Sequence, residues 1–394
     1  MKWGKLFYWL LLLVAVLMLS ACGSSLKSQE EKEQNNGGQQ EVKKSNTEEP
    51  SKVETTPPEP IVQTIQLSAV GDILIHEDLY NAASVGNNQY DFTPMFELVK
   101  PYMEGADITF ANQETMIGGV ELGLSTYPAF NSPVEIGDAL KNSGVDIVSI
   151  ANNHTLDRRE QAVLNSIDHW NKIGMLYTGA YSSFEDQKSI RVIEKDGIKV
   201  AFIAYTYGTN GIPVPEGKEY LVNLIDKQRI KDEIDRAEEI ADVVAVSLHF
   251  GNEYERMPNE AQKELVQFSV DEGADLIIGT HPHVLQPFSW VQGKDGNRAY
   301  VMYSLGNFFS GQIGEYKQMG GIASIEIEKV IDGEQIDITL KNPKFLPTYV
   351  RRQKDFKIIP MHLLTNDDVK NPQGLLEDLK RHMSQEVPEL EFVS

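Results

Sequence analysis

The sequence contains a single cysteine, Cys22, and it lies close to the N-terminus. Without a second cysteine the chain cannot form an internal disulfide, and the residues that follow Cys22 supply no thiol nucleophile and no thiolate metal ligand. Any metal in the folded part must therefore be held by His, Asp, Glu or Asn side chains. The fold must be stabilised by an apolar core, for which a chain of this length is ample.

Basic residues are also scarce relative to acidic ones. The formal net charge is −22. Residues 1–21 contain two lysines, and residues 22–60 contain five lysines against eight glutamates, so −21 of this charge falls on residues 61–394. A body this acidic excludes nucleic acid as a partner and excludes electrostatic docking to anionic lipid.

Long apolar runs are absent except at the N-terminus. Lys2 and Lys5 precede an apolar stretch from Leu6 to Leu19, which is short for a membrane span and typical of a secretory signal. The stretch ends in "LSAC", which resembles a bacterial lipoprotein signal and implies a signal peptide over residues 1–21, cleavage before Cys22 and acylation of its thiol, for example with palmitate. The alternative is an uncleaved N-terminal anchor helix. Both readings place the body on the extracytoplasmic face of the cell membrane, attached to it.

Residues 22–60 contain almost no apolar side chains. The segment is rich in Ser, Gly, Gln, Glu, Lys and Pro, from which no core can be built. We expect a disordered tether between the lipid anchor and the folded part.

Apolar strands alternate with helices from residue 61 onward. Strands are expected over 64–75, 106–115, 145–157, 241–251 and 274–284, and helices over 95–104, 158–174 and 258–273. This alternation, with interspersed hairpins, predicts an α/β domain with buried mixed sheets over residues 61–345. Residues 346–394 are expected to form a C-terminal extension that packs on the domain, with little regular structure after Pro343 until a helix from Gly374 to Met383.

Polar side chains recur just after the buried strands, at the edge where α/β sheets bind ligands. Each of five such loops carries His, Asp, Asn or Glu: Asp72 with His76, Asn112 with Glu114, Asn153 and His154 with Asp157, His249 with Glu253, and His281 with His283. The last pair flanks Pro282, and on an extended segment its two imidazoles would point to the same side. Five such loops favour a metal site distributed over the fold.

Imidazole nitrogen with carboxylate and amide oxygen suits Mn, Mg, Zn or Fe. Two such ions, clamped by ligands from several strands, could bind a phosphate-like group and activate a water. Simpler interpretations stay open for single residues. His281 and His283 would be loop histidines, Asn153 a helix N-cap, His76 a surface residue, Glu253 a solvated carboxylate, and Asp157 a helix cap or a partner that orients His154.

Six segments together resemble a known family: "GDILIH", "NQET", "ANNHTLD", "HFGNEYE", "GTHPHVLQP" and "YSLGNFF". They look like the motifs of the CapA family of poly-γ-glutamate capsule proteins, over about residues 65–312. That family is similar to the calcineurin-like metallophosphoesterases. The resemblance implies a four-layer β-sandwich of mixed sheets flanked by helices.

The resemblance also implies roles for single residues. Asp72 and His283 would hold one divalent metal, and Asn153, His249 and His281 the other, with Glu114 near the bridging position. His154 would act as the general acid. Five further residues would orient these side chains by contacting them: His76, Asn112, Asp157, Glu253 and Asn307.

Two features depart from the phosphoesterase pattern. The histidine of the first loop, His76, lies four residues after Asp72 instead of two, and the usual bridging aspartate is absent, with Asn112 and Glu114 in its loop.

The implied function is a membrane-anchored, extracytoplasmic role in the synthesis or export of poly-γ-glutamate or a related surface polymer, through a metal centre that allows hydrolysis. The alternative is a non-catalytic scaffold or a polymer-binding subunit of a membrane synthase. A solute-binding lipoprotein would not need this set of metal ligands.

Overall fold

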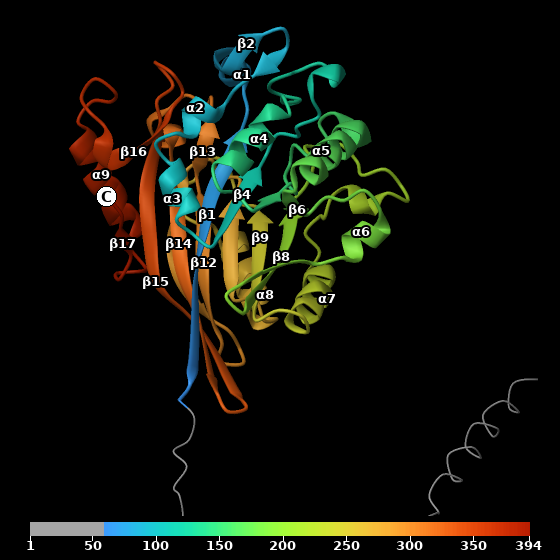
Figure 1. Cartoon of the computed structure of the whole chain (residues 1–394), viewed down its shortest axis with the longest axis vertical. Coiled ribbons are helices and arrows are strands. Elements are labelled where there is room, and N and C mark those ends of the chain that lie inside the picture. The colour runs from blue at the N-terminus through green and yellow to red at the C-terminus, as the bar shows by residue number, and fades with distance from the viewer. Residues whose placement is uncertain (1–58) are drawn as a thin grey trace, which may run out of the picture. The chain divides into compact units, whose positions relative to one another are not determined.

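The computed structural model describes residues 59–394, in which two large sheets lie between layers of helices (Figure 1). These residues belong to a compact unit, Pro58–Ser394. The signal peptide, Cys22 and nearly all of the expected tether lie outside the described residues. Over the part of the chain that is described, no helix has both the length and the apolar character that crossing a bilayer requires.

The first sheet has nine strands within residues 59–394, and β1 lies near its middle. On one side of β1 the strands β4, β5 and β6 run parallel to it, and on the other side β14 and β15 form a long antiparallel hairpin. The strands are β1 (Ile61–Leu74), β4 (Ile108–Gln113), β5 (Ile147–Ser149), β6 (Leu176–Thr178), β13 (Asn307–Ser310), β14 (Met319–Asp332), β15 (Gln335–Val350), β16 (Ile358–Pro360) and β17 (Glu391–Phe392).

The second sheet has six strands in the described chain, in the order β11-β12-β10-β9-β8-β7. Its four central strands are parallel to one another, and antiparallel hairpin partners close both edges. The strands are β7 (Arg191–Lys195), β8 (Ile198–Thr206), β9 (Val243–His249), β10 (Leu276–Thr280), β11 (Leu285–Gln292) and β12 (Arg298–Leu305); a separate small hairpin is formed by β2 (Ser84–Gly86) and β3 (Gln89–Tyr90).

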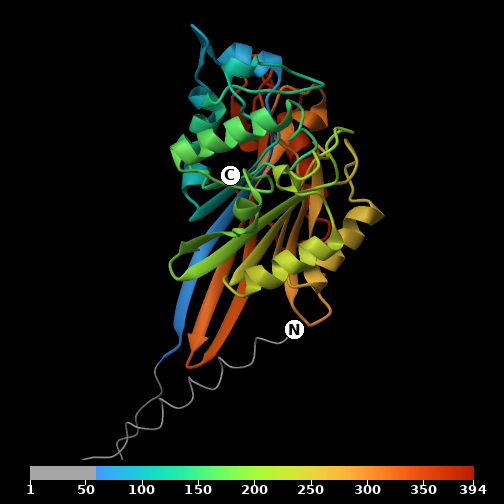
Figure 2. The ribbon, with the colours of Figure 1, turned by 90° about the vertical axis from the view of Figure 1, so that its right-hand side faces the viewer.

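Three apolar clusters show the layering. One joins α4, α5 and neighbouring helices to the first sheet, the second lies between the two sheets, and the third joins α7 and α8 to the second sheet (Figure 2). The α-helices are α1 (Glu77–Ala83), α2 (Thr93–Phe96), α3 (Lys100–Glu104), α4 (Glu135–Asn142), α5 (Arg159–Ile173), α6 (Phe184–Lys188), α7 (Lys227–Glu238), α8 (Glu260–Asp271) and α9 (Pro372–Met383); short 3-10 turns are η1 (Val120–Leu122), η2 (Glu219–Leu221), η3 (Glu315–Gln318) and η4 (Met361–Leu363). This helix–sheet–sheet–helix order confirms the predicted α/β class with four layers.

Two local predictions are wrong. The helix expected over 95–104 is divided into α2 and α3, because Pro101 lies in the first turn of α3 and has no N–H to continue a helix. The chain after Pro343 is not irregular, since β15 continues to Val350. It accommodates Pro343 in a bulge, where Asn342 takes a φ of 54° and the register with β14 shifts.

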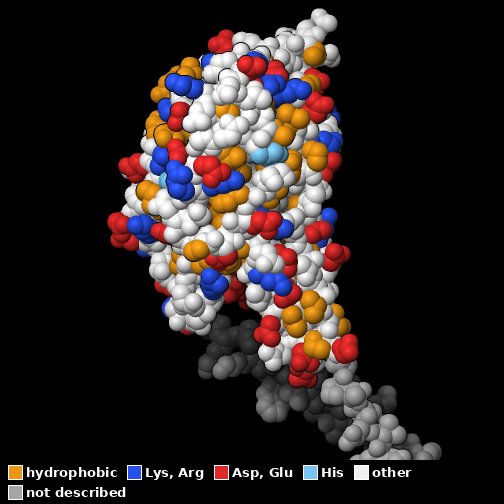
Figure 3. Space-filling view, turned by 90° about the vertical axis from the view of Figure 1, so that its left-hand side faces the viewer, with side chains coloured by type: hydrophobic (Ala, Val, Ile, Leu, Met, Phe, Trp, Pro, Cys, Tyr) orange, Lys and Arg blue, Asp and Glu red, His pale blue; other side chains and the backbone are white. Residues whose placement is uncertain are grey.

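The residues after β15 complete the first sheet and the core. β16 and β17 pair with β15, and Leu379 and Met383 of α9 are buried in the cluster between the sheets. On the face shown in Figure 3, basic side chains are scattered among acidic ones, and no continuous basic patch is visible.

Candidate metal centre at the shared end of the two sheets

The parallel strands of both sheets end on the same side of the molecule, and their connecting loops meet there. Two glycines allow the strands to approach closely. A Cβ at Gly71 would lie 2.0 Å from the Gly306 carbonyl oxygen, and one at Gly279 would lie 2.0 Å from that of Tyr303. The backbone N–H of Asp72 donates to the Gly306 oxygen at 2.9 Å. The residues that follow these glycines are thereby brought into one cluster.

One half of the cluster consists of Asp72, Glu114 and His283, whose ligand atoms lie within 4.8 Å of one another. His283 Nδ1 is 3.0 Å from Asp72 Oδ2, and His283 Nε2 is 3.5 Å from Glu114 Oε1. Asn112 donates to the other Asp72 oxygen at 2.9 Å, and Asn307 Oδ1 lies 3.1 Å from His283 Nδ1. These amides fix the orientation of the two side chains that they contact.

The other half consists of Glu114, His249 and His281, again within 4.8 Å. His249 Nε2 is 2.8 Å from Asn153 Oδ1 and 3.8 Å from Glu114 Oε1. His249 Nδ1 lies 2.9 Å from the Thr280 hydroxyl, which fixes the ring. The oxygen of Asn153 therefore belongs to this half.

Glu114 is the residue that the two halves share. It is completely buried, and within residues 59–394 neither of its carboxylate oxygens has a hydrogen-bond partner. His281 Nδ1 is a further buried atom without a partner in this part of the chain. Leaving a buried carboxylate unsatisfied is costly, so these atoms fit a missing cation. The nitrogen and oxygen donors around them are the ligands that divalent ions such as Mn, Zn and Fe accept.

The electrostatics of the cluster also fit a cation. Burial lowers the pKa of His281 to about 3 and that of His249 well below its usual value, so both rings are neutral, the form that binds metal. Burial raises the pKa of Glu114 well above its usual value, and the charge of Asp72 raises it further. Burial opposes protonation of His283, but Glu114 and Asp72 outweigh this effect and raise its pKa to about 9. A positive charge beside these carboxylates would therefore stabilise them, and a divalent ion would supply it in place of protons.

The segment that carries His281 and His283 does not have the expected extended backbone. Their φ values are 97° and 57°, in the left-handed region that non-glycine residues rarely adopt. The tight loop nevertheless holds the two rings 5.9 Å apart between centroids, with His281 in one half and His283 in the other. Strained backbone at such a position is common where a site must hold a defined geometry.

His154 lies beside the second half and is oriented by two neighbours. Its Nδ1 is 2.7 Å from Asp157 Oδ2, and its ring packs edge-on against Phe130 at 4.8 Å. The same Asp157 oxygen accepts the backbone N–H of Phe130 at 2.8 Å. Neither Asn153 nor Asp157 caps α5, whose N-cap is Arg158.

The expected supporting residues His76 and Glu253 differ in their relation to the two halves. His76 turns toward the backbone, with Nδ1 3.1 Å from the Leu74 oxygen and 3.3 Å from the Gly311 nitrogen, and it joins no ligand group of the described residues. Glu253 does approach the cluster, since its carboxylate lies within 4.8 Å of ligand atoms of His281 and His283.

The sequence reasoning missed the loop after β8. Asn210 accepts a hydrogen bond from Asn153 at 3.2 Å, and its amide nitrogen lies 3.4 Å from His154 Nδ1. The Tyr207 ring lies 4.7 Å from His281 and stacks on His249. The signal was present, because "YGTN" follows a buried strand as the other five loops do.

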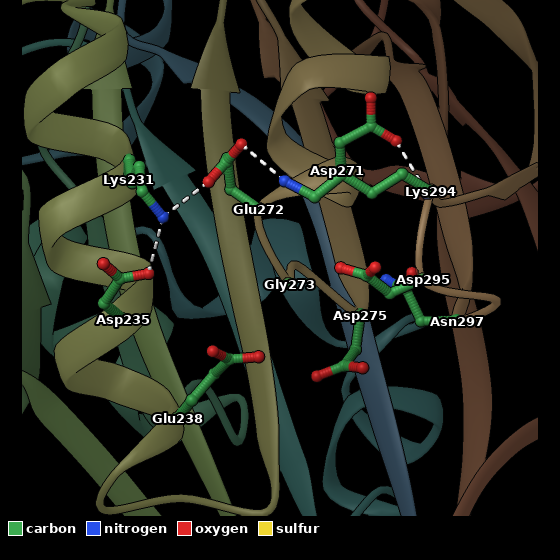
Figure 4. Close-up of a pocket in the computed structure, with 10 residues that line it drawn as sticks. All are labelled: Lys231, Asp235, Glu238, Asp271, Glu272, Gly273, Asp275, Lys294, Asp295 and Asn297. Atoms are coloured by element: carbon green, nitrogen blue, oxygen red, sulfur yellow. Dashed lines mark hydrogen bonds and ion pairs between the residues drawn. The ribbon is translucent and has the colours of Figure 1, made fainter.

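A cavity of about 310 Å³ lies at the opposite end of β10, beside α7 and α8 (Figure 4). Its lining is mostly acidic, and its two lysines are engaged in ion pairs. Lys231 pairs with Asp235 and with Glu272, and Lys294 pairs with Glu272 at 2.9 Å. This cavity contains none of the candidate metal ligands.

Fold and site together define an α/β sandwich with candidate divalent-metal ligands at its strand ends. The chain belongs to the family of bacterial capsule synthesis proteins described as PGA_cap, whose model matches residues 66–312. All six motifs that suggested the CapA resemblance fall within this range, and the resemblance is confirmed.

Two CapA proteins of Bacillus are among the similar sequences. The chain is 28% identical over 262 residues to the "Capsule biosynthesis protein CapA" of Bacillus anthracis, covering 62% of this chain and 60% of that protein. It is 27% identical over 263 residues to the "PGA biosynthesis protein CapA" of Bacillus subtilis (strain 168), covering 62% and 63%. The match therefore spans less than two thirds of the length of these relatives.

Two solved structures of bacterial phosphoesterase and nucleotidase proteins are similar to this chain at a low level. The calcineurin-like phosphoesterase YfkN of Bacillus subtilis aligns with a TM-score of 0.41 and 16% identity, covering 81% of this chain and 100% of that one. The NAD nucleotidase NadN of Haemophilus influenzae aligns with a TM-score of 0.44 and 10% identity, covering 84% and 57%. Similarity at this level carries no inference about activity.

Proposed function

We propose that this chain is a membrane-anchored, extracytoplasmic protein that acts in the synthesis or export of poly-γ-glutamate or a related surface polymer, through a divalent-metal centre of metallophosphatase type. Membership of the capsule synthesis family supports the polymer role. The lipoprotein-like "LSAC" ending at Cys22 supports the anchor. Subunits of a membrane synthase are the partners that such a location favours.

The observation that carries the metal centre is Glu114. Its two buried, unpartnered oxygens lie between Asp72 with His283 on one side and His249 with His281 on the other. A carboxylate shared by two nitrogen-containing groups is the arrangement that a two-ion site uses to bridge its ions. Asp72, Glu114 and His283 would hold one ion; Glu114, His249, His281 and Asn153 would hold the other.

Bound ions would supply Lewis acidity and lower the pKa of a bound water. The chain's own residues contribute the rest. His154, held through Nδ1 by Asp157, is placed to give a proton from Nε2 to a leaving oxygen. Phe130 packs on the ring of His154 and limits the orientations that it can take.

The sequence contains two arginine pairs that could form a basic patch for a polyanion, Arg158-Arg159 and Arg351-Arg352, and three of these four side chains are already engaged. Arg158 donates to the backbone oxygens of residues 122 and 123. Arg351 pairs with Asp355 and Asp368, and Arg352 with Asp78. These pairs leave little basic charge for a polymer.

One other cation lies beside the candidate centre. Lys317 Nζ is 3.5 Å from the centroid of the Tyr254 ring, which itself lies 6.2 Å from His283. Lys317 forms no ion pair with the residues of 59–394. An anionic ligand bound at the centre would be attracted by this charge, which favours an acidic substrate.

Metal content and hydrolysis measured on one preparation test the proposal. A chain of residues 58–394 would be reconstituted with Mn, Fe, Zn or Mg, analysed for bound metal, and assayed on bis-p-nitrophenyl phosphate. We expect bound metal and metal-dependent hydrolysis that His154→Ala reduces by about 10²- to 10⁴-fold without loss of metal. Metal binding without hydrolysis would instead favour a scaffold that binds polymer through its ions, and the absence of both would exclude the metal centre.

The anchor is tested separately in the full chain. Replacing Cys22 by Ser removes the only thiol that can be acylated, so we expect the protein to leave the membrane fraction or to accumulate as an unprocessed precursor. Processing and fractionation identical to those of the unmodified chain would overturn this part.

A further inference from the structure

An exposed carboxylate lies over the histidines that join the two halves of the candidate centre. Ligand atoms of Glu253, His281 and His283 all lie within 4.8 Å of one another. Glu114 reaches the same histidines from the buried interior, where its exposed fraction is 0%, whereas Glu253 is exposed. Glu253 therefore approaches from the solvent side, where a substrate would enter.

The backbone around Glu253 is fastened to the histidine loop. The N–H of Phe250 donates to the Thr280 oxygen at 3.1 Å, and that of Tyr254 donates to the Pro282 oxygen at 2.8 Å. Tyr254 itself has a φ of 68°, in the left-handed region. That conformation is unfavourable for a residue other than glycine, so the surrounding contacts hold the loop in place.

Glu253 has no competing cationic partner in the described chain, since it forms no ion pair with Lys or Arg. The half of the centre around Asp72 also lacks the first-loop histidine of the phosphoesterase pattern, because His76 lies four residues after Asp72 and contacts backbone instead. A carboxylate within reach of His283 could fill that position.

We propose that Glu253 is a displaceable ligand of the metal pair. It would bind metal beside His281 and His283 until an anionic group of the substrate takes its place. This inference rests on the proposed metal centre and adds to it the way in which the substrate enters. Buried Asp72 and Glu114 neutralise only part of the charge of two divalent ions, so a third carboxylate is attracted to the exposed side. A phosphate-like or carboxylate group of a substrate carries the same kind of charge and competes for the same place.

The test compares Glu253→Gln with Glu255→Gln in the chain of residues 58–394. Glu255 is also exposed and lies two residues away, but it belongs to no ligand group, so its variant controls for the loss of one charge near the site. Titration calorimetry would give the affinity for Mn²⁺, and then the affinity of the Mn²⁺-loaded protein for inorganic phosphate. Thermal unfolding without metal would show that both variants are folded.

We expect Glu253→Gln to weaken Mn²⁺ binding by about tenfold, because a ligand is lost. We expect the same variant to tighten phosphate binding by about tenfold, because the fraction of protein with a free position rises. If Glu253→Gln matches Glu255→Gln in either affinity, the displaceable ligand is excluded. If the unmodified chain binds no Mn²⁺, the metal centre itself has failed, which is a separate result.

Discussion

At the scale of single residues, Glu114 is the side chain that its surroundings leave least satisfied. Most buried carboxylates in proteins accept hydrogen bonds or pair with a cation. Among the residues described, neither oxygen of Glu114 accepts a hydrogen bond, its nearest cationic group is the His283 ring at 3.5 Å, and Asp72 adds a second negative charge nearby. Such an arrangement would be strongly destabilising for folding alone. It is expected where a protein keeps ligands ready for an ion.

Asp157 tests whether His154 depends on its orientation. Asp157→Asn would replace the charged carboxylate beside His154 Nδ1 with a neutral amide, whose oxygen can keep the contact with the Phe130 N–H, so the ring would lose its charge-assisted hydrogen bond. We expect kcat for a phosphodiester to fall by about 10- to 100-fold, which is less than the loss for His154→Ala. KM and metal content should stay unchanged. A parallel loss of metal, or a change in KM alone, would show that Asp157 acts on the fold or on binding instead.

The ligands could be predicted because they follow a rule of strands: each lies just after a buried apolar run, and parallel strands bring such positions to one edge. The conformation of the loops could not. The sequence does not show that His281 and His283 take positive φ values, because neither is a glycine and no turn motif at these positions requires that conformation. The position of Asn210 was not predicted, although it follows the buried strand β8.

At the scale of elements, the glycines of "GD" and "GT" set the distance between strands. Gly71 lies against the backbone oxygen of Gly306, and Gly279 against that of Tyr303, so neither place has room for a methyl group. These contacts join β1 to the chain between β12 and β13, and β10 to β12. They thereby set the positions of Asp72 and of the histidine loop.

Gly71→Ala tests whether the close approach of β1 to residue 306 is required. The added Cβ would push β1 away from residue 306, and we expect a loss of about 1–3 kcal/mol in the free energy of unfolding, as in other overpacked interiors. Metal affinity should fall as well, because Asp72 and Asn307 are displaced. Gly208→Ala is the matched control, since a Cβ there meets no atom within 4 Å. Equal stability of the two variants, measured by denaturant unfolding, would contradict the account.

The elements themselves were largely predictable, because strands and helices of different periodicity alternate along the chain. The turns at Asp196-Gly197 and Asp295-Gly296 join the hairpins as their sequences indicate. The failures have local causes. Pro101 divides a helix that apolar spacing alone would continue, and Pro343 is tolerated in β15 only because a bulge removes its need for an N–H.

At the scale of the whole molecule, residues 59–394 supply a large apolar core of their own, and residues 22–58 contain almost no apolar side chains. The first core residue along the chain is Ile65, and each of the three apolar clusters draws its members from the residues that follow. A chain that begins at Pro58 should therefore be soluble and folded. Its thermal unfolding temperature should match that of the acyl-free chain from Gly23 onward. Aggregation, or a clearly lower unfolding temperature, would show that residues 23–57 contribute to the fold.

The whole account depends on two ions that share Glu114 between two histidine-containing halves. The most direct measurement is the metal content, by elemental analysis, of the chain of residues 58–394 and of its His281→Ala, His283→Ala and Glu114→Gln variants after reconstitution with Mn²⁺. The account predicts about two ions in the unmodified chain, about one in each histidine variant, and a loss from both positions in Glu114→Gln. Four proteins with equal metal content, or an unmodified chain that binds none, would contradict it.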